Sequence, residues 1–103
     1  MTLTDENRAK LNALYRLLRN GNVTKRQVMD IFAVSERTAR DMLSEVAKRA
    51  PLISVSDTAG YRIAVTPRDV GDAKHAYNEN KKRAEEILKR NEPLEKFLEE
   101  YAT

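Results

Sequence analysis

The sequence of 103 residues lacks cysteine and contains a single histidine, His75. Without thiols, the chain forms neither a disulfide nor a thiolate metal site. One histidine and no glycine-rich phosphate loop leave no set of residues typical of catalysis, so we predict no enzyme activity, no cofactor and no metal site. No apolar run is long enough for a membrane span and no signal-peptide core is present. We therefore expect a cytoplasmic protein with no membrane partner and no small-molecule ligand.

Glycine, proline and aromatic residues are also scarce: the chain has three glycines, three prolines and six aromatic residues. Few glycines and prolines favour helices over an all-β fold, and few aromatics predict a small aliphatic core. The net charge of +3 is unevenly distributed. Residues 1–66 carry 11 Lys/Arg against 7 Asp/Glu, whereas residues 67–103 carry 8 against 9. The basic excess therefore lies in the first part, where a phosphate-binding surface would need it.

Local capping signals predict where the helices begin. Thr4, Ser35 and Thr66 each precede a helical pattern, and Thr24 forms a capping box with Gln27. The predicted helices cover about residues 4–20, 24–32, 36–49 and 66–91, with a kink or a break near residue 93 and a short final helix through residue 101. These boundaries follow from helical spacing of apolar residues and from the glycine and proline that end such patterns.

Two details of this pattern are specific enough to check. Gly21 is placed to end the first helix with a positive φ. Val28, Ile31 and Phe32 are expected to form the buried face of the second helix.

Two short alternating runs follow the third helix, Ile53 to Val55 and Tyr61 to Val65, separated by the turn cluster 57–60. They predict an antiparallel β-hairpin. The predicted fold is mostly α with a small β-hairpin, forming a winged helix-turn-helix head over residues 1–66. Residues 67–103 are predicted to form a long C-terminal helical extension.

The start of the third helix reads Val34-Ser-Glu-Arg-Thr-Ala-Arg40, and Tyr61-Arg-Ile63 follows after the turn. These motifs resemble the winged helix-turn-helix superfamily, especially the heads of DeoR-type and biotin-repressor-type bacterial regulators. The resemblance implies that the recognition helix, residues 35–49, enters the major groove of double-stranded DNA with the hairpin alongside. Where that family often has a glycine in the turn, this chain has Ala33, which costs about 1 kcal/mol if a positive φ is required.

The resemblance and the outward face of the third helix together give the candidate DNA-binding residues. They are Lys25, Arg26, Ser35, Glu36, Arg37, Thr38, Arg40, Asp41, Ser44 and Arg62. Arg37, Arg40 and Thr38 each have an alternative role that involves no DNA. Arg37 and Arg40 can bind guanine edges or phosphates, or pair with Glu36 and Asp41 on a solvated face. Thr38 can donate to a phosphate or pack against the second helix.

The C-terminal extension shows apolar and small residues at alternating intervals of three and four, the spacing of a coiled-coil seam. The predicted dimerisation residues are Val70, Ala73, Tyr77, Asn80, Ala84, Ile87, Leu94 and Leu98. The natural partner of such a seam is the same helix in a second subunit, which suits a protein that reads two DNA half-sites. Two alternatives are that the extension folds back on its own head, or that its end forms a short hook for another protein.

These observations lead to two functional hypotheses. The first is a sequence-specific double-stranded DNA-binding protein, a small bacterial or phage transcriptional regulator that acts as a homodimer. The second is a winged-helix adaptor that binds a protein partner in a replication, partition or transcription complex. Glu36 and Asp41 favour the adaptor, because acids on the outward face repel phosphate.

Overall fold

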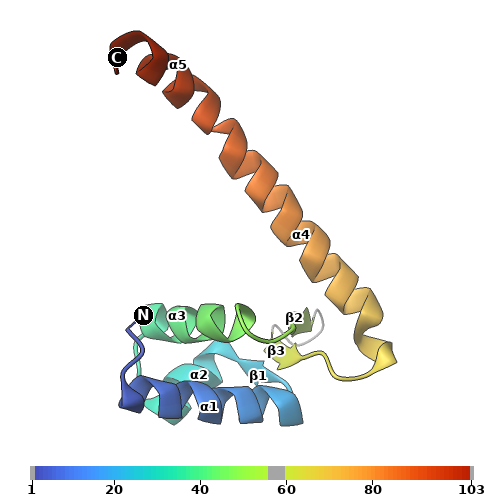
Figure 1. The fold of residues 1–103 in the computed structure, drawn as a ribbon. Coiled ribbons are helices and arrows are strands. Elements are labelled where there is room, and N and C mark those ends of the chain that lie inside the picture. Colours follow the sequence, from blue (N-terminus) through green and yellow to red (C-terminus); the bar gives the residue numbers. More distant parts are fainter. Residues whose placement is uncertain (1, 56–59, 103) are drawn as a thin grey trace. The chain divides into compact units, whose positions relative to one another are not determined.

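The computed structural model describes residues 2–55 and 60–102, and its described chain is mostly helical with one small antiparallel sheet (Figure 1). The elements are α1 (Asp5–Asn20), β1 (Val23–Thr24), α2 (Lys25–Phe32), α3 (Glu36–Ala47), β2 (Leu52–Val55), β3 (Gly60–Ile63), the 3-10 turn η1 (Pro67–Asp69), α4 (Val70–Lys89) and α5 (Asn91–Tyr101). The predicted mostly helical fold with a small hairpin and long helical extension is confirmed.

Helix α1 begins as its capping signal predicts, but the residue that follows its last turn does not have the predicted conformation. The Thr4 hydroxyl accepts a hydrogen bond from the Asn7 backbone N–H at 3.1 Å, and Asp5 and Glu6 lie in the first turn, near the positive end of the helix dipole. The prediction for Gly21 is wrong: its φ of 171° and ψ of −177° are extended backbone. The chain passes almost directly from α1 into β1, so an extended residue is required at this point rather than a left-handed one.

The core of the head lies among α1, α2, α3 and the sheet. Its buried side chains are Leu11, Leu14, Leu18, Val23, Val28, Ala39, Met42, Leu43, Val46 and Ile63. Ile31 is a correction to the predicted buried face of α2, because 56% of it is exposed. In this eight-residue helix Val28 points into the core, and Met29 and Phe32 pack beside it. Ile31 therefore lies at the edge of the buried stripe and faces solvent.

The sheet contains one strand more than the predicted hairpin. Its order is β1-β3-β2, with β3 in the centre and both neighbours antiparallel to it. Tyr61 of β3 lies opposite Val23 of β1 on one side and opposite Ser54 of β2 on the other. The hairpin is thus anchored to the connection between α1 and α2. The predicted turn residues 57–59, together with Ser56, lie outside the described residues.

The chain divides into two compact units, residues 1–73 and residues 74–103. The first unit extends past residue 66, where we placed the predicted boundary, because the first turn of α4 is grouped with the head. In the second unit, the helical extension bends at Arg90, which keeps helical dihedral angles (φ −68°, ψ −15°) between α4 and α5. The Arg90 N–H donates to the Ile87 carbonyl, three residues back, at 3.1 Å. Pro93, two residues into α5, has no N–H to donate to the Lys89 carbonyl. A separate helix, α5, then runs from Asn91 to Tyr101.

Among the helices in the described part of the chain, none combines the length and the apolar character needed to cross a bilayer.

Candidate nucleic-acid interface

Local hydrogen bonds hold both ends of helix α2. At the start of α2, the Gln27 N–H donates to the Thr24 hydroxyl at 3.1 Å, and the Thr24 N–H donates to the Gln27 side chain at 2.8 Å. At its end, Ala33 adopts the left-handed conformation with φ 51° and ψ 50°. The Val34 N–H donates back to the Met29 carbonyl at 3.0 Å. The alanine therefore takes the positive φ for which related turns often use glycine.

Helix α3 begins with a cap that uses two of the predicted DNA-binding residues. The Ser35 hydroxyl accepts a hydrogen bond from the Thr38 N–H at 3.2 Å and donates to the Thr38 hydroxyl oxygen at 3.1 Å. The cap satisfies one of the orphan N–H groups of the helix start. The cap and the left-handed turn together fix the direction in which α3 leaves the turn.

Three of the candidate residues form one charged cluster across the two helix starts. Glu36 Oε1 lies 2.7 Å from Lys25 Nζ and 2.6 Å from Arg40 Nη2. The hydrogen bond from Lys25, followed by the charges of Lys25 and Arg40, holds the pKa of Glu36 below its usual range. Two cations thus share one carboxylate oxygen, and the cluster carries a net charge of +1. The acid that we expected to repel phosphate is neutralised within the protein.

The remaining candidates on α2 and α3 are exposed. Arg26 lies 3.7 Å from Asp30 in an exposed pair one turn apart, a geometry that contributes little to stability. Arg37, Asp41 and Ser44 are exposed along α3. Among the described residues, Arg37 has no acidic side chain within 4.0 Å. Its guanidinium is therefore available to an external anion.

Arg62, the candidate on the predicted wing, is engaged within the head. Its guanidinium contacts Asp69 Oδ1 and lies 3.8 Å from Asp72 Oδ2. Asp69 is only 2% exposed, and its Oδ2 accepts hydrogen bonds from the backbone N–H groups of Val65 at 2.9 Å and Thr66 at 3.3 Å. These backbone bonds, with Arg62 assisting, hold the pKa of the Asp69 carboxyl below its usual range despite its burial. Arg62 therefore ties β3 to the start of α4.

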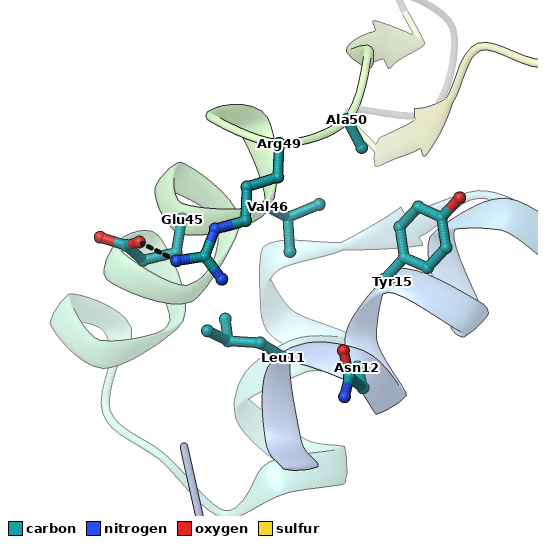
Figure 2. Close-up of a pocket in the computed structure, with 7 residues that line it drawn as sticks. All are labelled: Leu11, Asn12, Tyr15, Glu45, Val46, Arg49 and Ala50. Atoms are coloured by element: carbon teal, nitrogen blue, oxygen red, sulfur yellow. Dashed lines mark ion pairs between the residues drawn. The ribbon is translucent and has the colours of Figure 1, made fainter. Parts of the chain in front are cut away.

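A pocket of about 240 Å³ lies between α1 and the end of α3 (Figure 2). Leu11 and Val46 line it as buried apolar residues, and Tyr15 and Arg49 lie on its sides. Arg49 reaches back to Glu45, with Nη2 and Oε2 3.9 Å apart, and Lys48 also contacts this carboxylate at 3.0 Å. The hydrogen bond from Lys48 is the main cause of a lowered pKa for Glu45. Within the described ranges, no cluster of three or more His, Asp or Glu residues is arranged to hold a metal ion.

The predicted dimerisation residues lie on α4 and α5. Between residues 70 and 101, all of which the structure describes, no side chain is buried. The large apolar side chains of the second unit range from 53% exposed for Leu98 to 70% exposed for Tyr101. Within the second unit taken by itself, no other element covers the apolar stripe expected from the heptad spacing.

The two closest ion pairs between different elements of this interface were missed by the sequence reasoning. The pairing of Lys25 with Glu36 spans two helices, and that of Arg62 with Asp69 joins a strand to a helix start. Only the pairing of Arg40 with Glu36, four residues apart on one helix, was among the alternatives predicted.

Compared with protein-family models, curated proteins and solved structures, the chain gives no match.

Proposed function

We propose that the head binds double-stranded DNA as a winged helix-turn-helix module, with α3 in the major groove. The observation that carries this proposal is the position of Arg37. It lies exposed on the first turn of α3, with no acidic partner within 4.0 Å among the described residues. The left-handed Ala33 and the Ser35 cap orient the helix that presents it. The start of a recognition helix is the part that reaches base edges first.

The charges around Arg37 support the same proposal. Lys25 and Arg26 lie at the start of α2 and Arg40 lies one turn into α3, near where backbone phosphates approach a helix-turn-helix. Glu36 forms ion pairs with Lys25 and Arg40 and neutralises part of their charge. It therefore holds these two side chains in place. Arg62 is assigned to the junction with α4 and is left out of the proposed contacts.

We further propose that the protein is a cytoplasmic transcriptional regulator of bacterial or phage type and works as a homodimer through its tail, residues 70–101. Two heads in one assembly can bind two half-sites, which raises both affinity and specificity.

The second candidate function, a protein–protein adaptor, is favoured by Asp41. This acid is exposed on α3 beside Arg37, and no ion pair within 4.0 Å engages it in the described part of the chain. An adaptor would use the mixed charges of this face to bind a complementary protein surface.

Duplex binding as a function of salt concentration tests the first function. We expect the full chain to retain a random-sequence duplex at low salt and to lose it as salt increases, because phosphate contacts release counterions. The double variant Arg37→Ala/Arg40→Ala should weaken binding at least about tenfold and flatten the salt dependence by up to about one logarithmic unit per decade, because Glu36 already holds part of the charge of Arg40.

The matched control is Arg8→Ala/Arg16→Ala, which removes two charges from exposed positions on α1. We expect this variant to bind almost as well as the unmodified chain. Equal losses in both variants would show that only net charge matters, and duplex binding by the α3 variant at the unmodified level would refute the assignment to α3. No retention of duplex by any variant would favour the adaptor.

A further inference from the structure

Asp41 is an exposed acid on α3 to which the proposed contacts give no role. The buried stripe of α3 consists of Ala39, Met42, Leu43 and Val46. Because α-helical residues advance by about 100° each, Arg37, Asp41 and Ser44 lie within about 30° of the direction opposite this stripe. Arg40 lies about 70° from that direction. The centre of the outward face therefore presents one cation, one acid and one small hydroxyl, and Arg40 lies at its flank.

The two charged side chains at this centre have no ion-pair partner in the part of the chain that the structure describes. Arg37 and Asp41 are four residues apart, a spacing at which opposite charges can pair, yet neither has an oppositely charged group within 4.0 Å among the described residues. Arg40, by contrast, lies 2.6 Å from Glu36. The head therefore leaves Arg37 and Asp41 available to groups outside the protein.

We infer that Arg37 and Asp41 recognise two G·C base pairs of a bound duplex, with Arg37 at the guanine of one pair and Asp41 at the cytosine of the other. This inference rests on the proposed function, which places α3 in the major groove. It adds the base composition of the site, and it gives the acid that favoured an adaptor a role on DNA.

The hydrogen-bonding pattern of the major groove matches Arg37 to guanine. Guanine presents two acceptors there, N7 and O6, and a planar guanidinium donates to both at once. Adenine presents one acceptor beside a donor, thymine one acceptor beside a methyl group, and cytosine a donor. A bidentate contact with guanine is therefore the strongest contact that Arg37 can form with a base edge.

A carboxylate selects cytosine for the opposite reason. The Asp41 carboxylate only accepts hydrogen bonds, and the negative phosphates repel it. The donors of the major groove are the amino groups of cytosine and adenine. In adenine the acceptor N7 lies beside the amino group and repels a carboxylate, whereas cytosine has no such neighbour. Asp41 therefore favours cytosine and disfavours the other three bases.

The spacing of the two residues limits the distance between the two base pairs. Residues 37 and 41 are separated by about 6 Å along the helix axis. Successive base pairs are separated by about 3.4 Å. A helix lying along the groove therefore presents these residues to base pairs that are adjacent or separated by one. Ser44, one turn further along the same face, is small and lets the helix approach closely enough for the short Asp41 side chain.

Selection from a duplex library with a randomised central segment tests these base preferences. The full chain binds the library at a salt concentration that suppresses nonspecific retention, and the bound duplexes are sequenced. We expect enrichment of two G·C pairs that are adjacent or separated by one. In anisotropy titrations of the selected duplex, replacing either pair by A·T should weaken binding by about fivefold or more.

Two substitutions assign the base pairs to the two residues. Arg37→Ala should remove the preference at one pair and keep it at the other. Asp41→Asn should change the second preference from cytosine to adenine, because an amide both donates to adenine N7 and accepts from its amino group. The matched control Glu6→Gln removes an exposed carboxylate from α1 and should keep both preferences.

Other results separate the failure of this inference from the failure of the proposed function. Retention of duplex at low salt with no sequence enriched would refute base recognition and leave DNA binding by the head standing. If Asp41→Asn keeps its cytosine preference, or loses the guanine preference without gaining adenine, the assignment of Asp41 to cytosine is overturned. No retention of any duplex would overturn both the inference and the proposed function.

Discussion

Lys25 and Glu36, the first residues of α2 and α3, lie in contact, with Lys25 Nζ 2.7 Å from Glu36 Oε1. The pair links the starts of the two helices that form the proposed DNA interface. Because Arg40 uses the same carboxylate oxygen, one acid restrains two cations. The exposed face of this region is therefore less basic than its count of lysines and arginines indicates.

Replacing this acid should strengthen duplex binding. In Glu36→Gln, Lys25 and Arg40 lose their charged partner and become available to phosphates. We expect a several-fold tighter Kd and a salt dependence steeper by about one to two logarithmic units per decade. Fluorescence anisotropy of a labelled duplex at several salt concentrations measures both quantities.

Asp41→Asn is the comparison for this prediction. It also removes one negative charge from α3 but frees no cation, so its salt dependence should stay close to that of the unmodified chain. Equal steepening in the two variants would mean that the cluster around Glu36 does not restrain its cations.

Ala33→Gly should leave stability unchanged or increase it by up to about 1.5 kcal/mol. The left-handed conformation of Ala33 costs about 1–2 kcal/mol, and glycine relieves it while making the unfolded chain more flexible by about 0.4–1 kcal/mol. Urea unfolding followed by circular dichroism gives the free energy of unfolding. The control Ala9→Gly, at an exposed position inside α1, should lose about 1 kcal/mol. If the two variants lose the same amount, Ala33 is not strained.

Gly21→Ala should stabilise the head by about 0.4–1 kcal/mol. The residue is extended, and an added Cβ would meet no atom within 4 Å, so alanine fits while restricting the unfolded chain. Urea unfolding under the same conditions measures the change. A loss of stability would indicate that Gly21 takes a positive φ after all.

Asp69 should make the head sensitive to acid. Its pKa is lowered in the folded state, chiefly by the backbone bonds from Val65 and Thr66, so its stabilisation is fully present above its ordinary pKa of 3.8. The stabilisation is lost as pH falls below that value through the lowered pKa of the folded state. Thermal unfolding between pH 2 and pH 7 should therefore show Asp69→Asn with a lower Tm at neutral pH and a shallower fall in acid.

Some acid dependence should persist in that variant, because the pKa values of Glu36 and Glu45 are also lowered and their contributions decline below 4.5. Asp72→Asn serves as the control, since it removes an exposed carboxylate 3.8 Å from the same arginine. An acid profile of Asp69→Asn that parallels the unmodified profile would contradict the role given to this carboxylate.

Helix starts were the most predictable part of the fold, because their signals are local. The hydroxyls of Thr4, Thr24 and Ser35 cap their helices as predicted, each within three residues of its partner N–H. The sequence left a kink and a break near Pro93 open, and the structure bends at Arg90 between α4 and α5. The sequence also indicated that Ala33 occupies a turn position, which its positive φ confirms.

The missed features depend on residues distant in the sequence. Strand β1 has two residues, too few for an alternating pattern, and it exists because Val23 meets Tyr61 of β3. Ile31 has the right spacing for a buried face, but burial depends on where α1 and α3 lie. The contact of Arg62 with Asp69 likewise follows from the path of the chain after β3, which no local signal describes.

The extra strand also affects how two heads behave when they are close together. Because β1 pairs with Gly60 and Tyr61 of β3, the free edges among the described strands are those of β1, of the last two residues of β3 and of β2, none longer than four residues. Short edges are poor templates for adding a strand from another molecule. We therefore expect the heads to resist edge-to-edge aggregation even at the high local concentration that the proposed dimer creates.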